Sequence, residues 1–366
     1  MEYRKLPHGE AKLSTIGIGL ANLQTQGADD KNSLEVFETA FEGGINFFDL
    51  CCTKEDTFKV FGKVDKGERS KFHTQMHLGQ IYIDGEYGRD RDLEKTKRAF
   101  ETTLEYTGMD YTDFGFIHCV DEDEEFNQIM ENGTWDYLVN LKKQGVVKHI
   151  GFSSHTPEIA KKYIDTGLVD LFMFSVNPVF DYGKGEYGIG AIQERSDFYK
   201  YCESLGIGIT VMKPFAGGQL LDEKASPLGI ALTHNQCIKY VLDRPAVLSA
   251  LPGVTSAEEV KKVLEYYKAS DEDKDYSIIG TATPSEAVGR CVYCNHCAPC
   301  PVGINVSLVN KYYDLAKLGD ALAADHYKKL SLHAGDCVQC GSCNSRCPFK
   351  VNQTDRMLEI KDYFGF

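Results

Sequence analysis

The placement of the cysteines is the feature that most constrains how this chain can fold. Eight of the thirteen cysteines lie after residue 290, in two short groups, and the other five are scattered upstream (Cys51, Cys52, Cys119, Cys202 and Cys237). In a reducing compartment, closely spaced cysteines bind metal more often than they form disulfides. We therefore expect the C-terminal part of the chain to fold around metal centres.

The spacing within the two groups indicates which metal centres these are. The second group, CVQCGSCNSRCP, has the C-x2-C-x2-C-x3-C-P spacing of bacterial ferredoxins, and the first, CVYCNHCAPCP, has two residues before its last cysteine. In the ferredoxin spacing three thiolates bind one [4Fe–4S] cluster and the fourth, before the proline, binds the partner cluster. Crossed ligation then predicts one cluster on Cys291, Cys294, Cys297 and Cys347, and another on Cys337, Cys340, Cys343 and Cys300.

A pair of zinc sites is the alternative for these cysteines, because C-x2-C pairs also build zinc ribbons. Four close cysteines followed by proline, occurring twice, do not have ribbon spacing. We therefore favour two [4Fe–4S] clusters, which move electrons one at a time.

Upstream of the cysteine groups, from residue 15 to about 268, short apolar runs alternate with amphipathic segments. The runs are STIGIGL, INFFDL, KFHTQMHLG, DFGFIHC, VVKHIGFS, VDLFMFSV, GIGITVM and AVLSALPG. Eight strand–helix units are typical of a (β/α)8 barrel. A doubly wound sheet would also alternate, but GLANLQTQGADD after the first run lacks G-x-G-x-x-G. We predict an α/β fold, with a (β/α)8 TIM barrel over residues 1–275 and a C-terminal α-helical dicluster ferredoxin-like domain over 276–366.

The overall charge and hydropathy exclude several classes of partner. The formal net charge of −14 argues against nucleic acid or an anionic membrane as partner. No apolar run reaches the length of roughly 20 residues that a membrane span needs. The start of the sequence, MEYRKLPHGEAKL, lacks the apolar stretch of a signal peptide. These features predict a cytoplasmic protein.

Polar residues follow or end three neighbouring strands of the predicted barrel. Asp49 ends INFFD, His77 lies near the end of KFHTQMH, and His118 ends DFGFIH. Barrel enzymes place catalytic groups at the carboxyl ends of their strands. Lys54, in the loop after Asp49, joins these three as a catalytic candidate. Cys51, Cys52 and Cys119 are expected at the same rim, where small packing residues are the more common interpretation of isolated cysteines.

The ordered motifs of this region resemble the aldo/keto reductases, in particular the branch that carries a C-terminal 4Fe–4S domain. The resemblance rests on GGINFFD, YTDFGFIH, VVKHIGFSSHTPE, GIGITVMKPFAGG and ALPGVTSAEEV, and on the CAPCP ending of the first cysteine group. It covers almost the whole chain. It implies a barrel enzyme that reduces carbonyls with NADPH through an Asp, Tyr, Lys and His tetrad.

The sequence departs from that tetrad at the proton donor. Asp49 and His118 match the family's motifs, but Lys54 stands in the place of the tyrosine and His77 in the place of the lysine. A lysine ammonium beside Asp49 would hold its proton at neutral pH, because its reference pKa is about 10.4. His77, with a reference pKa near 6.5, is better suited to proton transfer at pH 7.

The nicotinamide site that the resemblance implies is also altered. Lys213, Gly217 and Gly218 match the phosphate-binding region after the seventh strand, where backbone amides and a lysine can hold a phosphate. Ser153 and Ser154 stand where the family has the Ser-Asn pair that binds the carboxamide. The eighth-strand loop has Glu258 and Glu259 where the family contacts the adenine and 2′-phosphate. Binding of NADP(H) is therefore left open.

We predict an oxidoreductase of the aldo/keto reductase type that passes electrons through its clusters to a small organic substrate at the barrel mouth. A ferredoxin- or flavodoxin-type protein is the expected redox partner. Three alternatives stay open: an NADPH-dependent carbonyl reductase with an altered tetrad, a non-catalytic electron-transfer subunit whose barrel is a docking scaffold, and redox-neutral proton chemistry such as dehydration.

Overall fold

The computed structural model describes residues 1–65, 67–183, 187–282, 288–317 and 321–366. The chain divides into two compact units. The first unit comprises Met1–Val176, Ile207–Pro214 and Leu248–Ala269, and the second comprises Asn177–Gly206, Phe215–Val247 and Ser270–Phe366. This division differs from the boundary after residue 275 that the sequence suggests for the two domains, and that boundary stays a prediction.

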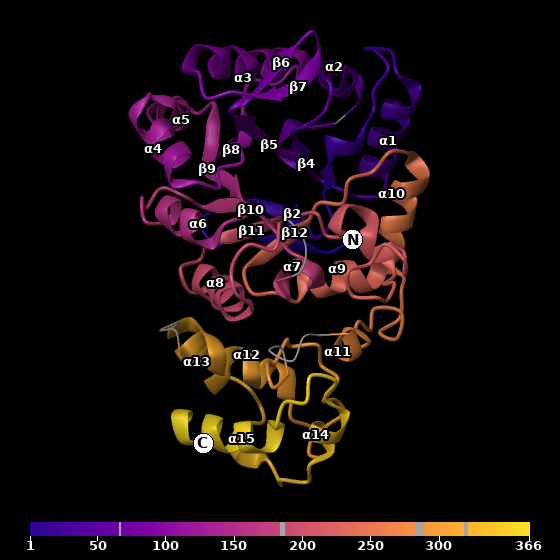
Figure 1. The fold of residues 1–366 in the computed structure, drawn as a ribbon, viewed down its shortest axis with the longest axis vertical. Coiled ribbons are helices and arrows are strands. Elements are labelled where there is room, and N and C mark those ends of the chain that lie inside the picture. Colours follow the sequence, from indigo (N-terminus) through magenta and orange to yellow (C-terminus); the bar gives the residue numbers. More distant parts are fainter. Residues whose placement is uncertain (66, 184–186, 283–287, 318–320) are drawn as a thin grey trace. The chain divides into compact units, whose positions relative to one another are not determined.

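Eight strands form a closed sheet (Figure 1). Their order around the sheet follows the chain: β3 (Ile18–Gly19), β4 (Phe47–Leu50), β5 (His73–Leu78), β8 (Thr112–Ile117), β9 (Val147–Ser154), β10 (Leu171–Ser175), β11 (Gly208–Met212) and β12 (Val247–Ala250). Parallel bridges from Ile16 to Ala250 and from Gly19 to Gly253 join the first strand's segment to the last, which closes the sheet. Each strand lies in one of the eight apolar runs, so the predicted (β/α)8 barrel is confirmed.

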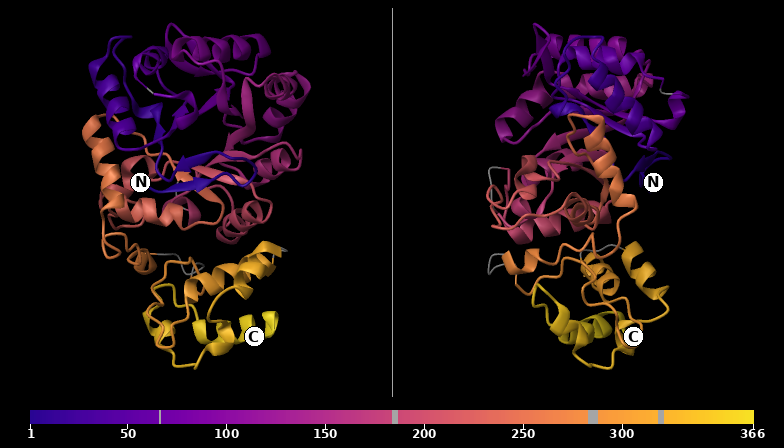
Figure 2. Two further views of the ribbon diagram at one scale, coloured as in Figure 1. Left: turned by 180° about the vertical axis from the view of Figure 1, so that it is seen from behind. Right: turned by 90° about the vertical axis from the view of Figure 1, so that its right-hand side faces the viewer.

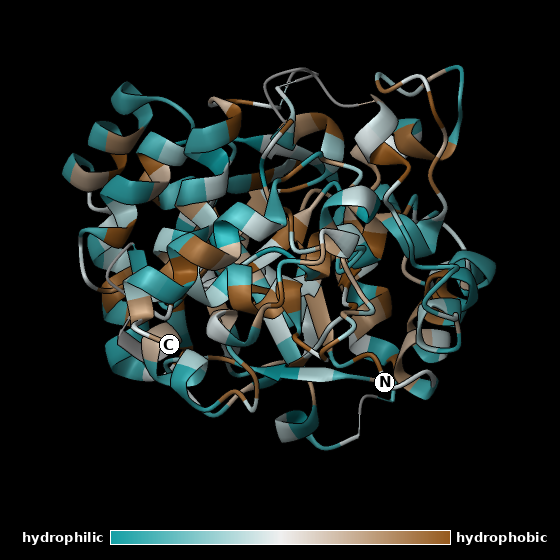
Figure 3. Cartoon of the chain, turned by 90° about the horizontal axis from the view of Figure 1, so that it is seen from below, coloured by the Kyte–Doolittle hydropathy of each residue, from teal (hydrophilic) through white to brown (hydrophobic). Residues whose placement is uncertain are grey.

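The helices of the first unit lie outside its strands (Figure 2). They are η1 (Leu20–Asn22), α1 (Lys31–Glu42), α2 (Glu55–Lys63), η2 (Arg69–Lys71), α3 (Leu93–Thr107), α4 (Asp123–Glu131), α5 (Thr134–Gln144), α6 (Pro157–Ile164), α10 (Ala257–Leu264) and η4 (Glu265–Tyr267). Asp30 and Asp92 begin α1 and α3 as N-caps, since each carboxylate accepts a backbone N–H of the first turn. Hydrophilic and hydrophobic segments alternate along the helices (Figure 3), as expected of helices with one buried face.

The interior of the barrel is filled by large apolar side chains at the end opposite the predicted site. Phe47 and Phe114 pack there with Leu6 and Leu13. Phe116 belongs to the same apolar cluster and also packs against His77, with ring centroids 5.3 Å apart. Leu6 directly follows β1 (Tyr3–Lys5) and Leu13 lies in β2 (Lys12–Ser14), and these two strands form an antiparallel hairpin. Because side chains alternate along a strand, Asp49 faces the same side of the sheet as Phe47, one step nearer the carboxyl end.

The second unit holds the remaining helices and the cysteine groups. Its helices are α7 (Pro178–Asp181), α8 (Ile192–Ser204), η3 (Ala216–Leu221), α9 (His234–Leu242), α11 (Ile279–Ala282), α12 (Val306–Lys317), α13 (Ala321–Lys328), η6 (Ala334–Asp336), α14 (Ser342–Arg346) and α15 (Gln353–Phe364). A 3.2 Å ion pair from Lys311 to Glu203 joins α12 to α8. The buried Arg244 guanidinium donates to the Val292 carbonyl and to the Tyr276 hydroxyl. These polar contacts tie the cysteine-rich segment to helices that the sequence assigns to the barrel.

Among the described residues, no helix combines the length and the apolar character that a membrane crossing requires.

Candidate functional site

Three of the predicted catalytic residues lie together at the carboxyl ends of adjacent strands. Asp49 and His77 are the next-to-last residues of β4 and β5, and His118 directly follows β8. All three are buried, with exposed fractions of 6%, 0% and 3%. The structure therefore brings Asp49, His77 and His118 into one cluster at the position where barrel enzymes bind their substrates.

The three side chains are joined by hydrogen bonds into a chain that ends at a tyrosine. Nε2 of His77 lies 2.9 Å from Oδ1 of Asp49, and Nδ1 of His118 lies 3.2 Å from Nδ1 of His77. The hydroxyl oxygen of Tyr87 lies 2.6 Å from Nε2 of His118. Gln75 orients Asp49, at the end of the chain opposite Tyr87. Its Nε2 donates to Asp49 over 2.8 Å, while its Oε1 accepts from Thr210 over 3.2 Å.

The partners in this network determine which atom carries the proton in each hydrogen bond. An ionised carboxylate only accepts hydrogen bonds, so the Nε2 of His77 that faces Asp49 carries a proton. The Nδ1 of His77 then accepts from the Nδ1–H of His118, and the Nε2 of His118 accepts from the Tyr87 hydroxyl. The chain is therefore directional, with every donor pointing from Tyr87 toward Asp49.

Burial keeps both ends of the Tyr87–His118 contact uncharged at neutral pH. Burial lowers the pKa of His118 well below its ordinary value, and the neighbouring His77 and Arg91 lower it further. Burial also raises the pKa of Tyr87, and the neighbouring Cys52 and Cys51 add to that increase. The chain therefore runs from the buried, neutral imidazole of His118 to the neutral phenol of Tyr87, which is 38% exposed.

Tyr87 comes from a hairpin that sequence reasoning missed. The hairpin consists of β6 (Gln80–Ile83) and β7 (Glu86–Arg89), and it follows β5 directly. Its two turn residues, Asp84 and Gly85, have φ angles of 52° and 80°, as a two-residue type I′ turn requires. The Asp-Gly pair between QIYI and EYGR is the sequence signal that could have identified the hairpin.

Lys54 lies apart from this chain of hydrogen bonds. It is the N-cap residue of α2, and its ammonium pairs with the Glu86 carboxylate of the hairpin over 3.0 Å. Within the described ranges, no hydrogen bond or ion pair connects Lys54 with Asp49. The structure thus links Lys54 to the hairpin that carries Tyr87.

Two adjacent thiols complete the surroundings of His118. Sγ of Cys51 lies 3.1 Å from Sγ of Cys52 and 3.4 Å from Nδ1 of His118. Cys51 is buried, and Cys52 is partly exposed. Burial and the neighbouring Cys52 raise the pKa of the Cys51 thiol well above its ordinary value. Cys119 lies farther out, where Arg89 donates to its carbonyl over 3.2 Å.

The serines and the lysine predicted for the nicotinamide site have partners within the first unit. Ser153 accepts from the Cys119 amide over 2.7 Å, and Ser154 donates to Asp121 over 3.1 Å. Although burial opposes the effect, hydrogen bonds from His155 and Ser154 lower the pKa of Asp121 to about 2. His155, which sequence reasoning missed, lies 2.9 Å from Asp121 and 3.0 Å from the ammonium of Lys213.

The two predicted phosphate-binding glycines belong to the second unit. Gly217 and Gly218 lie in η3 with φ angles of 68° and 90°, a backbone conformation that glycine adopts without strain. Among the described residues, apart from each glycine's own chain neighbours, no heavy atom lies within 4 Å of the position that a Cβ would occupy at either glycine.

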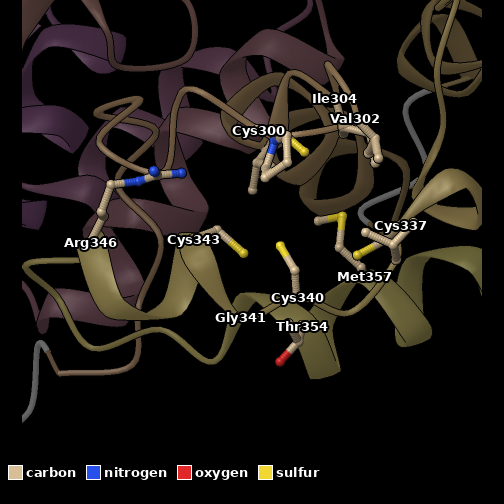
Figure 4. Close-up of a pocket in the computed structure, with 13 residues that line it drawn as sticks. Cys300, Val302, Ile304, Cys337, Cys340, Gly341, Cys343, Arg346, Thr354 and Met357 are labelled. Carbon is tan, nitrogen blue, oxygen red and sulfur yellow. The ribbon is translucent and has the colours of Figure 1, made fainter.

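The eight clustered cysteines surround two separate cavities. Cys300, Cys337, Cys340 and Cys343 line the first, and in Figure 4 their sulfur atoms are drawn around a common space. Cys291, Cys294, Cys297 and Cys347 line the second. The structure therefore groups the cysteines in the two sets of four that crossed ligation predicts.

The donor set and its hydrogen bonds fit an iron–sulfur cluster in each cavity. The backbone N–H of Gln339 donates to Sγ of Cys337, and that of Val351 donates to Sγ of Cys347, both over 3.4 Å. Such N–H donors stabilise cluster thiolates and tune the cluster's potential. Arg346 joins the two cysteine groups, since it donates to the carbonyls of Cys297 and Pro299 over 2.8 and 2.6 Å.

Two family models match the chain. The model of the aldo/keto reductase family matches residues 15–235, and that of the 4Fe-4S dicluster domain matches residues 287–351. The two matched ranges do not overlap.

Curated relatives and solved structures are similar to the barrel. The uncharacterized oxidoreductase YqkF of Bacillus subtilis is 20% identical over 72% of this chain and 90% of its own length. The glyoxal reductase of the same organism is 25% identical over 52% of this chain and 64% of its own length. The holo form of aldo-keto reductase AKR11C1 from Bacillus halodurans has a TM-score of 0.62 at 20% identity, covering 78% of this chain and 97% of that one.

Proposed function

Because the chain belongs to the aldo/keto reductase family and carries a 4Fe–4S dicluster domain, we propose that it is an iron–sulfur oxidoreductase acting on a small organic substrate at the barrel mouth. Electrons enter one at a time from a ferredoxin- or flavodoxin-type donor. The observation that carries the proposal is the combination of two four-cysteine cavities with a hydrogen-bond chain that runs from the buried Asp49 to Tyr87.

The eight cysteines supply the ligands for two [4Fe–4S] clusters in this proposal. Cys300, Cys337, Cys340 and Cys343 hold one cluster, and Cys291, Cys294, Cys297 and Cys347 hold the other. When bound, each cluster accepts and releases a single electron. The N–H donors of Gln339 and Val351 stabilise the negative charge of the thiolates that they contact.

Tyr87 supplies the proton in this proposal, in place of the residue that the family uses. Its oxygen lies where the hydrogen-bond chain ends, so a substrate oxygen beside it can exchange a proton with the phenol. Proton delivery starts from the reversed chain, in which Asp49 is protonated. As Tyr87 gives its proton to the substrate, Asp49, His77 and His118 each pass one proton to the next group toward Tyr87, and the chain ends in the direction described above with both imidazoles neutral. His118 and His77 are the relay, and Lys54 positions the hairpin through Glu86.

A small carbonyl compound is the substrate class that we propose. The glyoxal reductase similar to this chain carries that class in its name. Reduction of a carbonyl to an alcohol consumes two electrons and two protons, which suits a site with a buried proton chain. Glyoxal is therefore the first compound to test.

The alternative with NADPH as hydride donor is supported by the open space at Gly217 and Gly218. The start of α10 argues against it. There the Glu259 carboxylate accepts from the Thr255 amide over 2.6 Å, so an anion occupies the helix terminus that the family offers to a phosphate.

One experiment separates these proposals. The full chain is purified without oxygen, its iron is measured, and its absorption and paramagnetic resonance spectra are recorded before and after addition of reduced methyl viologen or NADPH. We expect about eight irons per chain, reduction by viologen, and glyoxal-dependent reoxidation. Reduction by NADPH alone would favour the nicotinamide alternative, whereas zinc in place of iron would overturn the proposal.

A further inference from the structure

The two adjacent thiols at the end of β4 form the closest sulfur–sulfur contact among the described residues outside the cluster cavities. Sγ of Cys51 and Sγ of Cys52 are 3.1 Å apart, and both residues are free cysteines. The contact is a hydrogen bond in which either thiol can donate, so the two sulfur atoms already face each other at close approach.

A shared metal ion fits this geometry less well than a bond between the sulfurs. Cys51, Cys52 and His118 form a donor set that a thiophilic metal could use. Two thiolates on one tetrahedral zinc, each with a Zn–S bond of about 2.3 Å, lie about 3.8 Å apart. The observed 3.1 Å is shorter, and both ring nitrogens of His118 already have partners in Tyr87 and His77.

We propose that Cys51 and Cys52 are a redox-active dithiol that closes reversibly to a disulfide, which makes the pair a two-electron group beside His118. Only the source of its electrons rests on the proposed function. The pair stores the two electrons that carbonyl reduction consumes, whereas ferredoxin-type donors deliver them singly.

The chemistry of closure follows from the exposure of the two residues. Cys52 is partly exposed, so its thiolate attacks an external disulfide such as glutathione disulfide, forming a mixed disulfide and releasing one glutathione thiolate. The buried Cys51 then attacks the Cys52 sulfur and releases the second glutathione, and its proton leaves with that thiolate. Two electrons from a one-electron donor and two protons reopen the bond and restore both thiols.

The surroundings assist both directions of this reaction. The Nδ1–H of His118, which is directed to His77, also lies 3.4 Å from Sγ of Cys51, so the same N–H can form a second, weaker hydrogen bond to a thiolate there. The Cα atoms of adjacent residues are about 3.8 Å apart, below the roughly 4.4 Å that unstrained disulfides need. A strained disulfide is easily reduced, which is typical of labile or catalytic disulfides rather than structural ones. Cys52 already has a φ angle of 57°, so its backbone departs from an ordinary strand.

Mass spectrometry of a single peptide tests the proposal directly. Cleavage after Lys31 and Lys54 releases residues 32–54, which contain Cys51 and Cys52 and no other cysteine. The anaerobic full chain is equilibrated in buffers from dithiothreitol to glutathione disulfide, with diamide as the strongest oxidant. It is then denatured in N-ethylmaleimide and digested. We expect two alkyl groups on the peptide in dithiothreitol, and a peptide lighter by two hydrogens with no alkyl group under oxidising conditions.

Single variants separate an internal disulfide from other products. In Cys51→Ser the resolving thiol is missing, so glutathione stays attached to Cys52. Cys119→Ser removes a nearby thiol that takes no part, and should convert as the wild type does. Retention of both alkyl groups in diamide, or zinc bound to Cys51 and Cys52, would overturn the proposal. Because the readout needs neither clusters nor substrate, a failure here is distinct from a failure of the proposed oxidoreductase.

Discussion

The hydroxyl oxygen of Tyr87 lies 2.6 Å from Nε2 of His118, although the two residues belong to a hairpin and to the end of a barrel strand. Arg91 holds the hairpin to the backbone at His118. Arg91, just past the hairpin, donates to the carbonyls of His118 and Cys119, both over 2.7 Å. The hairpin therefore brings a phenol to a site whose own strand ends lack one.

Replacing Tyr87 tests whether this phenol is the proton donor. We expect Tyr87→Phe to lower glyoxal turnover with reduced viologen by roughly 10²–10⁴-fold, the usual contribution of a general acid. The cluster spectra should not change. The measurement is kcat, together with its dependence on pH.

Tyr82→Phe is the matched control for this variant. Tyr82 lies opposite Tyr87 in the same hairpin, and among the described residues its buried hydroxyl has no hydrogen-bond partner. Its loss should change turnover less than threefold, since no proton path includes it. Equal losses in the two variants would indicate damage to the hairpin rather than a missing acid.

Lys54 offers a separate test, because the sequence also predicts it as a catalytic residue. We expect Lys54→Met to reduce turnover by less than tenfold, since the ammonium contacts Glu86 and not the proton chain. An exposed ion pair of this kind contributes about 0–1 kcal/mol to stability. Turnover of Lys54→Met and Tyr87→Phe is compared in one assay. A larger loss in Lys54→Met would indicate that Lys54, and not Tyr87, is the proton donor.

Sequence reasoning identified the residues whose position depends on strand periodicity. Asp49, His77 and His118 lie at or near the ends of apolar runs. In a parallel barrel the carboxyl ends of the strands lie at one face, independently of the conformation of the loops. The grouping of the cysteines could also be predicted, because the spacing before a proline directs one thiol of each group to the other cluster.

The parts that sequence reasoning missed depend on contacts between distant segments. Tyr87 lies ten residues beyond His77, and its role depends on a hairpin folding back over the strand ends. The hydrogen bonds of His155 with Asp121 and Lys213 join three different loops. No local sequence pattern predicts that these side chains are in contact. The approach of Cys51 and Cys52 is likewise invisible in the sequence, since adjacent side chains on a strand point to opposite faces and only the left-handed conformation of Cys52 brings them together.

The lowered pKa of His118 predicts how stability changes with pH. In the unfolded chain a histidine titrates near 6.5, whereas in the folded protein His118 titrates lower. Below about pH 6.5 the unfolded state therefore binds more protons, and the free energy of unfolding falls as the pH decreases toward the folded value.

Urea unfolding of wild type and His118→Gln at pH 7.5 and 5.5 measures this effect. We expect the loss of stability between the two pH values to be smaller in His118→Gln, because the group that resists protonation is gone. His8→Gln removes an exposed histidine of the same unit and should keep the wild-type pH dependence. The same dependence in all three proteins would mean that His118 is not held neutral by the fold.

Crossed ligation can be tested by removing one cluster and then asking which remaining cysteine matters. We expect a chain with Cys291→Ser and Cys294→Ser to lose one cluster and keep about four irons in the cavity of Cys337, Cys340 and Cys343. Cys300 lines that cavity, whereas Cys347 lines the other. Adding Cys300→Ser should therefore disturb the remaining cluster, and adding Cys347→Ser should leave it intact. Iron content and the paramagnetic resonance signal of the reduced protein report the result, and the opposite pattern would show that each cysteine group holds its own cluster.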